Sequence, residues 1–257
     1  MTEPAENKDD GVSPDDTQSV TDRVVWEQPE GYAENLELIE THLEPFFGPN
    51  AIVFHEIVSD LVHLDVLVFE PTGDRDFWVY VTSGMGDIRM TVPEGVDPAE
   101  IGRAELMIGL PRDWGNKLSK YLNAIGRPDV DNVYWPIKQL KSLARYPHLA
   151  KTFLTHTHTI QNEDEQPYSS NSRINGAILA YSTLLPEGAD RLTLPDGDKL
   201  NFLGVTYLFP EEMDFKLQQG AEALFERLNK AGVNEVLDIK RQSVVRKSLL
   251  MRLLKGE

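Results

Sequence analysis

Two histidines stand two positions apart in the stretch FLTHTHTI, as His156 and His158. Along a β-strand, a spacing of two directs both side chains to the same face, so an extended chain here would present a pair of imidazoles. Such a pair could supply two ligands of a catalytic zinc site, which needs three protein ligands and one open position. The first question is therefore whether the chain contains the rest of a metal-dependent hydrolase.

The other ligands of such an enzyme would come from an earlier stretch, VFHEIVSDLVHLD, which contains two further histidines. His63 and Asp65 repeat the spacing of two, and Glu56 could act as the catalytic base. The candidate ligand set is therefore His55, His63, Asp65, His156 and His158.

Two zinc-enzyme signatures can be checked against these residues. In a His-x-His-x-Asp-His run, Ile160 and Gln161 stand where the aspartate and the last histidine would be. In a His-Glu-x-x-His run that starts at His55, Ser59 stands where the second histidine would be. A metal-dependent hydrolase is therefore the alternative function, with its third ligand drawn from a distant strand.

Other catalytic motifs are missing from the sequence. The chain has no cysteine, which excludes thiolate metal sites and cysteine nucleophiles, and it has neither a P-loop nor a G-x-S-x-G elbow. Gly84 and Gly86 lack the third glycine of a dinucleotide-binding loop, so we predict that they form tight turns with positive φ. A triad of Ser59, His63 and Asp65 can be drawn, but the last two are more typical of a half-exposed sheet face.

The chain is strongly acidic, with a net charge of -17 over 257 residues. Residues 1–22 carry -6 and residues 236–257 carry +4, so the part between them carries -15. A body with this charge repels nucleic acid and anionic lipid, and it attracts a basic protein partner. High solubility is the other consequence of such a charge.

The N-terminal part differs from the rest in composition. Residues 1–22 are acidic and nearly free of large apolar side chains, which predicts a disordered tail, and residues 23–257 are predicted to form one domain. The first residues have no apolar stretch typical of a signal peptide, and nowhere do eighteen apolar residues run together. We therefore expect a cytoplasmic protein.

Hydrophobic periodicity predicts an α+β fold, with a mixed, mostly antiparallel sheet flanked by helices. The predicted strands are 51–58, 61–69, 76–82, 103–111, 151–160, 176–183 and 201–209. The predicted helices lie within 32–48, at about 113–125, 136–145 and 211–230, and over the basic segment 243–257. Pro136 is expected in a first helical turn and Pro147 is expected to end that helix.

Two long blocks of the sequence are distinctive. The first is VFHEIVSDLVHLDVLVFEPTGDRDFWVYVTSGMGDIRM, and the second is RAELMIGLPRDW, which covers Arg103 to Trp114. Both blocks resemble the suppressor of fused family, especially its stand-alone bacterial members. The matching positions of the first block are His55, Glu56, His63, Asp65, Pro71, Thr72, Thr82, Gly84 and Met85. With the later GVTYLFPEEMDF and DIKRQSV, the resemblance covers about residues 30 to 245.

The resemblance implies an α+β domain without established enzymatic activity. Animal members of the family hold an extended segment of a transcription factor between two domains, and this chain is long enough for only the first of them. Bacterial relatives have been proposed as immunity proteins that neutralise toxins passed between competing cells. In the animal members the stretch that corresponds to FLTHTHTI lies near the bound peptide and has no histidine pair, so the family does not require a metal there.

We therefore predict a non-enzymatic binding protein of the suppressor of fused type, which occludes a protein partner such as a basic toxin domain. Asp65, His156 and His158 are the predicted partner-binding residues. No metal, other cofactor, nucleic acid or membrane is expected as a ligand.

Overall fold

The computed structural model describes residues 34–49, 52–54, 62–122 and 130–245. The predicted disordered tail, 1–22, lies outside the described residues, as does most of the predicted helix over 243–257. Among the described residues, no helix combines the length and the apolar composition needed to cross a bilayer.

One mixed sheet forms the centre of the molecule, and its strand order is β1-β2-β3-β4-β8-β6-β5, with β7 paired to β8 beside that path. The parallel pair of strands is β4 and β8, while the other strand pairs are antiparallel. The strands are β1 (Ile52–Phe54), β2 (Asp65–Phe69), β3 (Phe77–Ser83), β4 (Arg103–Pro111), β5 (Thr159–Gln161), β6 (Gly176–Tyr181), β7 (Arg191–Thr193) and β8 (Lys199–Leu208). The predicted fold class, α+β with a mostly antiparallel sheet, is confirmed.

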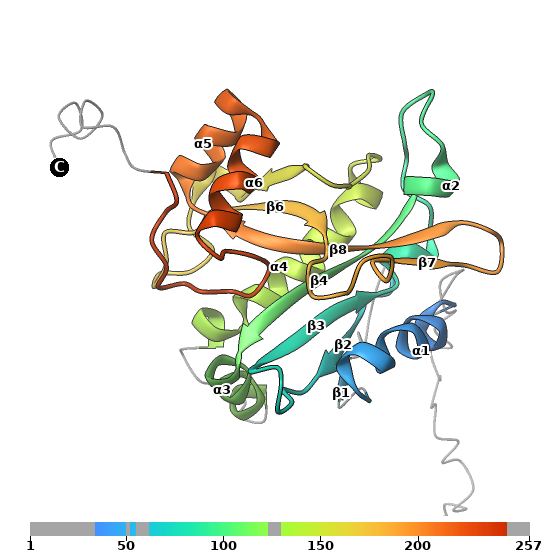
Figure 1. Ribbon diagram of the computed structural model, residues 1–257, viewed down its shortest axis with the longest axis horizontal. Helices are drawn as coiled ribbons and strands as arrows, with labels where there is room; N and C mark the ends of the chain where they lie inside the picture. The colour runs from blue at the N-terminus through green and yellow to red at the C-terminus, as the bar shows by residue number, and fades with distance from the viewer. Residues whose placement is uncertain (1–33, 50–51, 55–61, 123–129, 246–257) are drawn as a thin grey trace, which may run out of the picture.

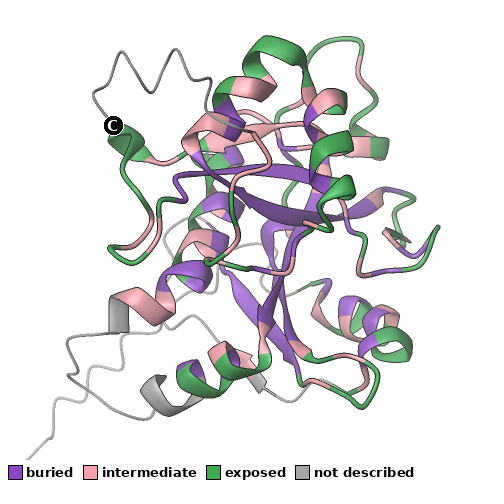
Figure 2. Ribbon diagram, turned by 60° about the vertical axis from the view of Figure 1, so that its left-hand side comes forward, coloured by how far each residue is buried: buried purple, intermediate pink, exposed green. Residues whose placement is uncertain are grey.

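Helices cover both faces of this sheet (Figure 1). The α-helices are α1 (Leu36–Phe47), α2 (Pro98–Ile101), α3 (Arg112–Leu122), α4 (Val130–Leu149), α5 (Pro210–Gln219) and α6 (Ala221–Lys230). Two short 3₁₀ helices, η1 (Met85–Asp87) and η2 (Glu163–Glu165), lie in loops. The sheet itself is the most deeply buried layer (Figure 2).

The core divides according to the face of the sheet. On one face, the largest apolar cluster joins alternate residues of the strands to α3 and α4. On the other face, α1 packs over the β2–β4 region, while α5 and α6 pack over β6 and β8. Helix α1 begins after Asn35 and ends at Gly48, whose φ of 81° suits a glycine at a helix C-terminus.

Three sequence predictions about helices and strands are wrong. The predicted helix 211–230 is two helices, because Gly220 with φ 89° separates α5 from α6. Pro136 and Pro147 lie inside α4 rather than at its ends. The predicted strand 151–160 is mainly loop and turn, and only Thr159 and Ile160 of it belong to β5.

Candidate partner-binding site at the edge strand β5

The stretch that contains His156 and His158 is a turn that leads into β5. The His158 N–H donates to the Thr155 carbonyl at 3.2 Å, and between them Thr157 adopts a φ of 72°. The Thr157 N–H donates to the Leu179 carbonyl, while the Leu179 N–H donates to the His158 carbonyl, at 2.8 and 2.9 Å. Two residues therefore face one on β6, which is the pattern of a β-bulge whose first residue is left-handed.

This bulge overturns the prediction that both histidines share one face of a strand. The His156 ring stacks between Tyr181 of β6 and Phe225 of α6, with ring centroids 5.4 and 5.3 Å away and interplanar angles of 6° and 12°. The His158 ring instead meets Phe153 edge-on at 4.8 Å. The two imidazoles thus make separate contacts.

His156 has one unsatisfied group. Its Nδ1 atom is buried and has no hydrogen-bond partner. Buried polar atoms of native proteins almost always have a partner, so an exception in a turn calls for an explanation. The aromatic stack fixes the ring in place without satisfying this nitrogen.

His158 is held in its neutral form at neutral pH. Burial lowers the pKa of its imidazole, and the nearby Lys216 ammonium lowers that pKa further, against the raising effect of a hydrogen bond with the Phe153 backbone. Lys216 itself donates to Thr159 Oγ1 at 3.3 Å, so α5 and β5 are in direct contact.

Strand β5 leaves one side of the sheet open. His158, Ile160 and Asn162 direct their backbone groups toward β6, as the bonds from Leu179 to His158 and from Asn162 to Asn175 show. Because the backbone groups of a strand alternate in direction, those of Thr159 and Gln161 point outward. In the described part of the chain, no residue hydrogen-bonds to these four outward groups.

The third predicted partner-binding residue, Asp65, lies elsewhere. Asp65 is the first residue of β2. In the sheet, β6 is the fourth strand along from β2, so the two strands are roughly 19 Å apart. Asp65 is 2% exposed and its carboxylate accepts a hydrogen bond from His63 Nε2 at 3.0 Å, while His63 is 8% exposed. The prediction of a half-exposed face for His63 and Asp65 is wrong, and Asp65 has an internal partner.

The hydrolase alternative finds no support in this geometry. His63 and Asp65 are separated from His156 and His158 by the width of four strands, while His55, Glu56 and Ser59 lie outside the described residues. Among the residues that the structure describes, no three histidine or carboxylate side chains come close enough to hold a metal ion.

A buried carboxylate that the sequence predictions missed holds the loop after β3. Glu105 is fully buried and accepts hydrogen bonds from Thr82 Oγ1 at 2.6 Å and from the Gly84 and Gly86 N–H groups at 2.9 Å. Burial raises the pKa of Glu105 to about 7, although these three hydrogen bonds lower it. The sequence did contain a signal for this buried carboxylate, because Glu105 is an acidic residue within the otherwise mainly apolar strand RAELMIGLP.

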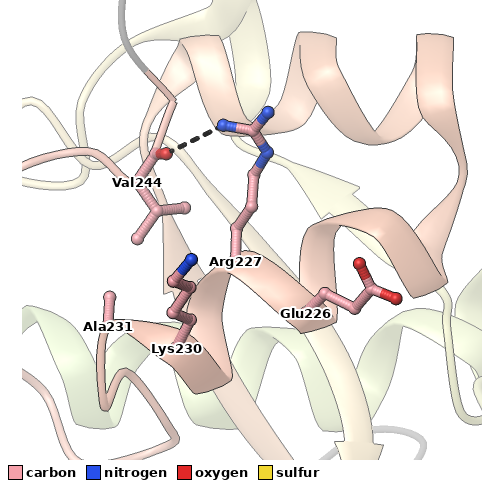
Figure 3. Close-up of a pocket in the computed structure, with 5 residues that line it drawn as sticks. All are labelled: Glu226, Arg227, Lys230, Ala231 and Val244. Carbon is pink, nitrogen blue, oxygen red and sulfur yellow. Dashed lines mark hydrogen bonds between the residues drawn. The ribbon is translucent and has the colours of Figure 1, made fainter.

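A pocket lies near the end of α6, and its lining includes none of the predicted site residues Asp65, His156 and His158. This open hollow has a volume of about 520 Å³ and lies between α6 and Val244 (Figure 3). Arg227 donates to the Val244 carbonyl at 3.4 Å there, and the Glu226 side chain points away from Arg227 and Lys230. The pocket is lined by Glu226, Arg227, Lys230, Ala231 and Val244.

Comparison with known proteins gives a consistent result. The family model described as "Suppressor of fused protein (SUFU)" matches residues 60–242, which is most of the chain. No curated protein matches the sequence significantly.

Three solved structures share the fold. A chain of the Sufu–Fu complex crystal structure is 18% identical, with a TM-score of 0.59 over 82% of this chain and 92% of that one. A structure described as a SUFU homolog from Neisseria gonorrhoeae FA 1090 is 20% identical, with a TM-score of 0.53 over 82% and 97%. Drosophila Suppressor of Fused is 19% identical, with a TM-score of 0.57, and the match covers 86% of this chain but 53% of that one.

Proposed function

The chain belongs to the suppressor of fused family, and we propose that it is a non-enzymatic protein-binding domain. One structural neighbour of the same fold comes from a complex of Sufu with Fu, which supports a role in binding another protein. The chain spans about half the length of the Drosophila protein, so the proposal concerns what a single domain can do.

The observation that carries this proposal is the open side of β5. A partner in extended conformation can add a strand there, because the N–H and C=O groups of Thr159 and Gln161 supply main-chain hydrogen bonds. His156 and His158 lie next to this strand and remain the proposed partner-binding residues. Asp65 contributes through the stability of the sheet, since its carboxylate is buried against His63.

The biological role we propose is that of a cytoplasmic immunity protein, which neutralises a toxin by occluding it. The part of the chain between the two termini carries most of the net charge of -17, so it attracts a basic domain such as a nuclease. Toxin and immunity genes are normally adjacent, so the product of the neighbouring gene is the first partner to test.

The test compares two substitutions at one position of the edge. Gln161→Pro removes an outward N–H and places a ring in the path of an added strand, while the bonds to β6 stay in place. Gln161→Ala shortens the side chain but keeps the backbone, so it is the matched control. The two variants and the parent are co-purified with the neighbouring gene product, and hydrogen exchange is followed at β5.

We expect the parent and Gln161→Ala to form the complex, with protection of the Thr159 and Gln161 amides from exchange. Gln161→Pro should lose the complex at unchanged melting temperature. A complex that all three proteins form equally, without protection at β5, would contradict binding at this edge.

A further inference from the structure

The hollow between α6 and Val244 has no part in the proposed function. It is lined by Glu226, Arg227, Lys230, Ala231 and Val244 (Figure 3). We propose that the C-terminal segment 246–257 of the same chain, which lies outside the described residues, docks in this hollow. This docking is independent of partner binding at β5.

The hollow offers apolar surface to a ligand. Ala231 and Val244 have side chains without polar atoms, and the methylene stems of Arg227 and Lys230 add further apolar surface. The charge of Arg227 is already engaged, because its guanidinium donates to the Val244 carbonyl at 3.4 Å and lies 4.4 Å from the centre of the Phe215 ring. The volume of about 520 Å³ falls within the range of roughly 300–1,000 Å³ typical of binding pockets, so the hollow has room for several side chains.

The segment begins at the wall of the hollow. Val245 is the last described residue, and Val244 before it lines the hollow and packs on the apolar cluster of α5 and α6. The Val244 N–H donates to the Glu212 carboxylate at 2.9 Å, which fixes the direction of the chain here. Leu249 and Leu250 follow Val245 by four and five residues, and this tether is long enough to turn back, since each residue spans at most about 3.6 Å. A short tether also gives the segment a high effective concentration at the hollow, which favours it over a separate protein.

The sequence of the segment, RKSLLMRLLKGE, has the pattern of an amphipathic helix. In a helix, the residues that share one apolar face are Leu249, Leu250, Leu253 and Leu254. The residues on the opposite, polar face are Ser248, Arg252 and Lys255. An isolated helix of this length is marginal in water, so its leucines need an apolar surface to pack against.

Charge favours the chain's own body over a membrane as the surface that receives the segment. The segment has four basic residues and one acid, so its net charge is +3, whereas residues 23–235 carry -15. A body of this charge attracts a basic segment and repels anionic lipid. Beside the hollow, Glu222 and Glu226 are exposed one turn apart on α6, and within the described part of the chain neither forms an ion pair. The Glu226 side chain points away from the cations of its own helix, so it is available to the basic residues of the segment (Figure 3).

The first experiment uses the absence of cysteine from the chain, because a pair of introduced cysteines is then unique. The full chain is prepared as Ala231→Cys/Leu250→Cys, which joins the hollow to the apolar face of the segment. The matched control is Ala231→Cys/Arg252→Cys, which has nearly the same tether but places the second cysteine on the polar face. Disulfide closure in a mild oxidant is followed by mass spectrometry at low protein concentration.

The second experiment changes the hollow instead of the segment. Ala231→Arg fills the hollow with a long cationic side chain, while Gln242→Arg adds the same charge at an exposed position outside its lining. Hydrogen exchange of the amides of residues 249–254 is compared in the parent and the two variants, and equal melting temperatures show that the fold is unchanged. Flotation of the parent with vesicles of phosphatidylcholine and phosphatidylserine tests a membrane as the alternative surface.

We expect the pair with Leu250→Cys to close about ten-fold faster than the pair with Arg252→Cys, because docking holds one face of the segment against the hollow. Exchange at 249–254 should be slow in the parent and in Gln242→Arg, and roughly ten-fold faster in Ala231→Arg. Equal closure rates, or equally fast exchange in all three proteins, would overturn the proposal. Protection that survives Ala231→Arg, disulfides between chains, or flotation with the vesicles would also overturn it, since these results point to another surface, a second copy or a membrane.

Discussion

The loop after β3 and the turn before β5 are both short, and each contains a residue at positive φ. In the loop that residue is Gly84, with φ 116°, and in the turn it is Thr157, with φ 72°. A glycine adopts this conformation at little cost, whereas a β-branched residue there is strained. The two segments thus meet the same backbone requirement in opposite ways.

Both segments contain buried polar groups. In the loop, the Glu105 carboxylate accepts three hydrogen bonds and Thr82 Oγ1 also accepts the Leu106 N–H, while Asp87 Oδ2 is buried without a partner. In the turn, Nδ1 of His156 is buried without a partner. The two segments therefore differ in backbone strain rather than in unpaired groups. Glycine at positive φ is typical of segments that stabilise a fold, while a strained residue is typical of segments that bind something. We therefore propose that the loop serves stability and that the turn with β5 serves partner binding.

The largest effect is expected from Gly84→Ala. A Cβ atom at this position would lie 2.0 Å from the His63 carbonyl oxygen, which is backbone and cannot move aside without displacing the chain before β2. We expect the free energy of unfolding to fall by at least about 4 kcal/mol, a loss typical of severe core disruption.

The matched control for this change is Gly95→Ala. Gly95 also has positive φ, 84°, but nothing lies within 4 Å of a Cβ atom there. Its loss should be limited to the cost of a left-handed alanine, about 1–2 kcal/mol. Chemical denaturation of both variants measures the difference, and equal losses would show that the loop is not tightly packed.

The second prediction concerns the pH dependence of stability, through Glu105→Gln. Burial raises the pKa of Glu105 from its ordinary value of 4.5 to about 7. Between these two values the folded protein keeps a proton that the unfolded chain has lost, so the free energy of unfolding falls as the pH rises through this window. The full effect of such a shift is about 3 kcal/mol.

Glutamine at this position has no proton to lose but can keep the hydrogen bonds. Its Oε1 accepts from the Gly84 and Gly86 N–H groups, and its Nε2 can donate to Thr82 Oγ1. Urea unfolding at several pH values from 4.5 to 7.5 should show a decline in the parent that is about 2–3 kcal/mol steeper than in the variant. Burial also raises the pKa of Asp87, which is present in both proteins, so the difference between the two curves reports Glu105 together with its electrostatic interaction with Asp87. Parallel curves would mean that Glu105 titrates normally.

Much of the fold was predictable because strand periodicity is a local property. The strand 103–111 was predicted with its observed bounds, and the first two predicted strands, 51–58 and 61–69, contain β1 and β2, which pair antiparallel. Helix boundaries were less predictable, because α4 accommodates Pro136 in its interior, where Tyr207 donates to the Pro136 carbonyl at 3.3 Å. A proline in the sequence predicts the end of a helix. It does not show whether tertiary packing keeps the helix continuous across that proline.

The candidate site was predictable only in part. His156 and His158 drew attention through their spacing, yet the Thr-His-Thr-His alternation favoured a strand and gave no hint that Thr157 is left-handed. Tyr181, Phe225 and Lys216 were not singled out, because each comes to the site from a distant part of the sequence. Nothing in the local sequence of Phe225 distinguishes it from an ordinary core residue of an amphipathic helix.

The third prediction is a loss of stability in Asp65→Ala. His63 hydrogen-bonds to the Asp65 carboxylate, while Arg103 bonds instead to Asp198, Asp196 and the loop carbonyls of Gly86 and Asp87. A charge-assisted bond in a buried place contributes roughly 1.5–3 kcal/mol, and we expect a loss in that range.

The exposed Asp113 provides the comparison for Asp65, since its substitution by alanine should change stability by less than about 0.5 kcal/mol. Thermal and urea unfolding of both variants at pH 7 test the difference. A similarly small change for Asp65→Ala would mean that its pairing with His63 adds nothing to the fold.

The smallest effect, and the one that separates the two segments most sharply, is expected from Thr157→Gly. A left-handed non-glycine residue costs about 1–2 kcal/mol, and glycine removes that cost but adds roughly 0.5–1 kcal/mol of chain entropy to the unfolded state. The variant should therefore be more stable than the parent by up to about 1 kcal/mol. Lys151→Gly, also at positive φ (50°) but without β-branching, should gain less stability.

If the strain at Thr157 serves binding, the stabilised variant should bind the partner more weakly, because glycine no longer fixes the bulge that sets the direction of β5. Denaturation and binding measured on the same preparation decide the point: a variant that gains stability and keeps its full affinity would show that the strain has no part in binding.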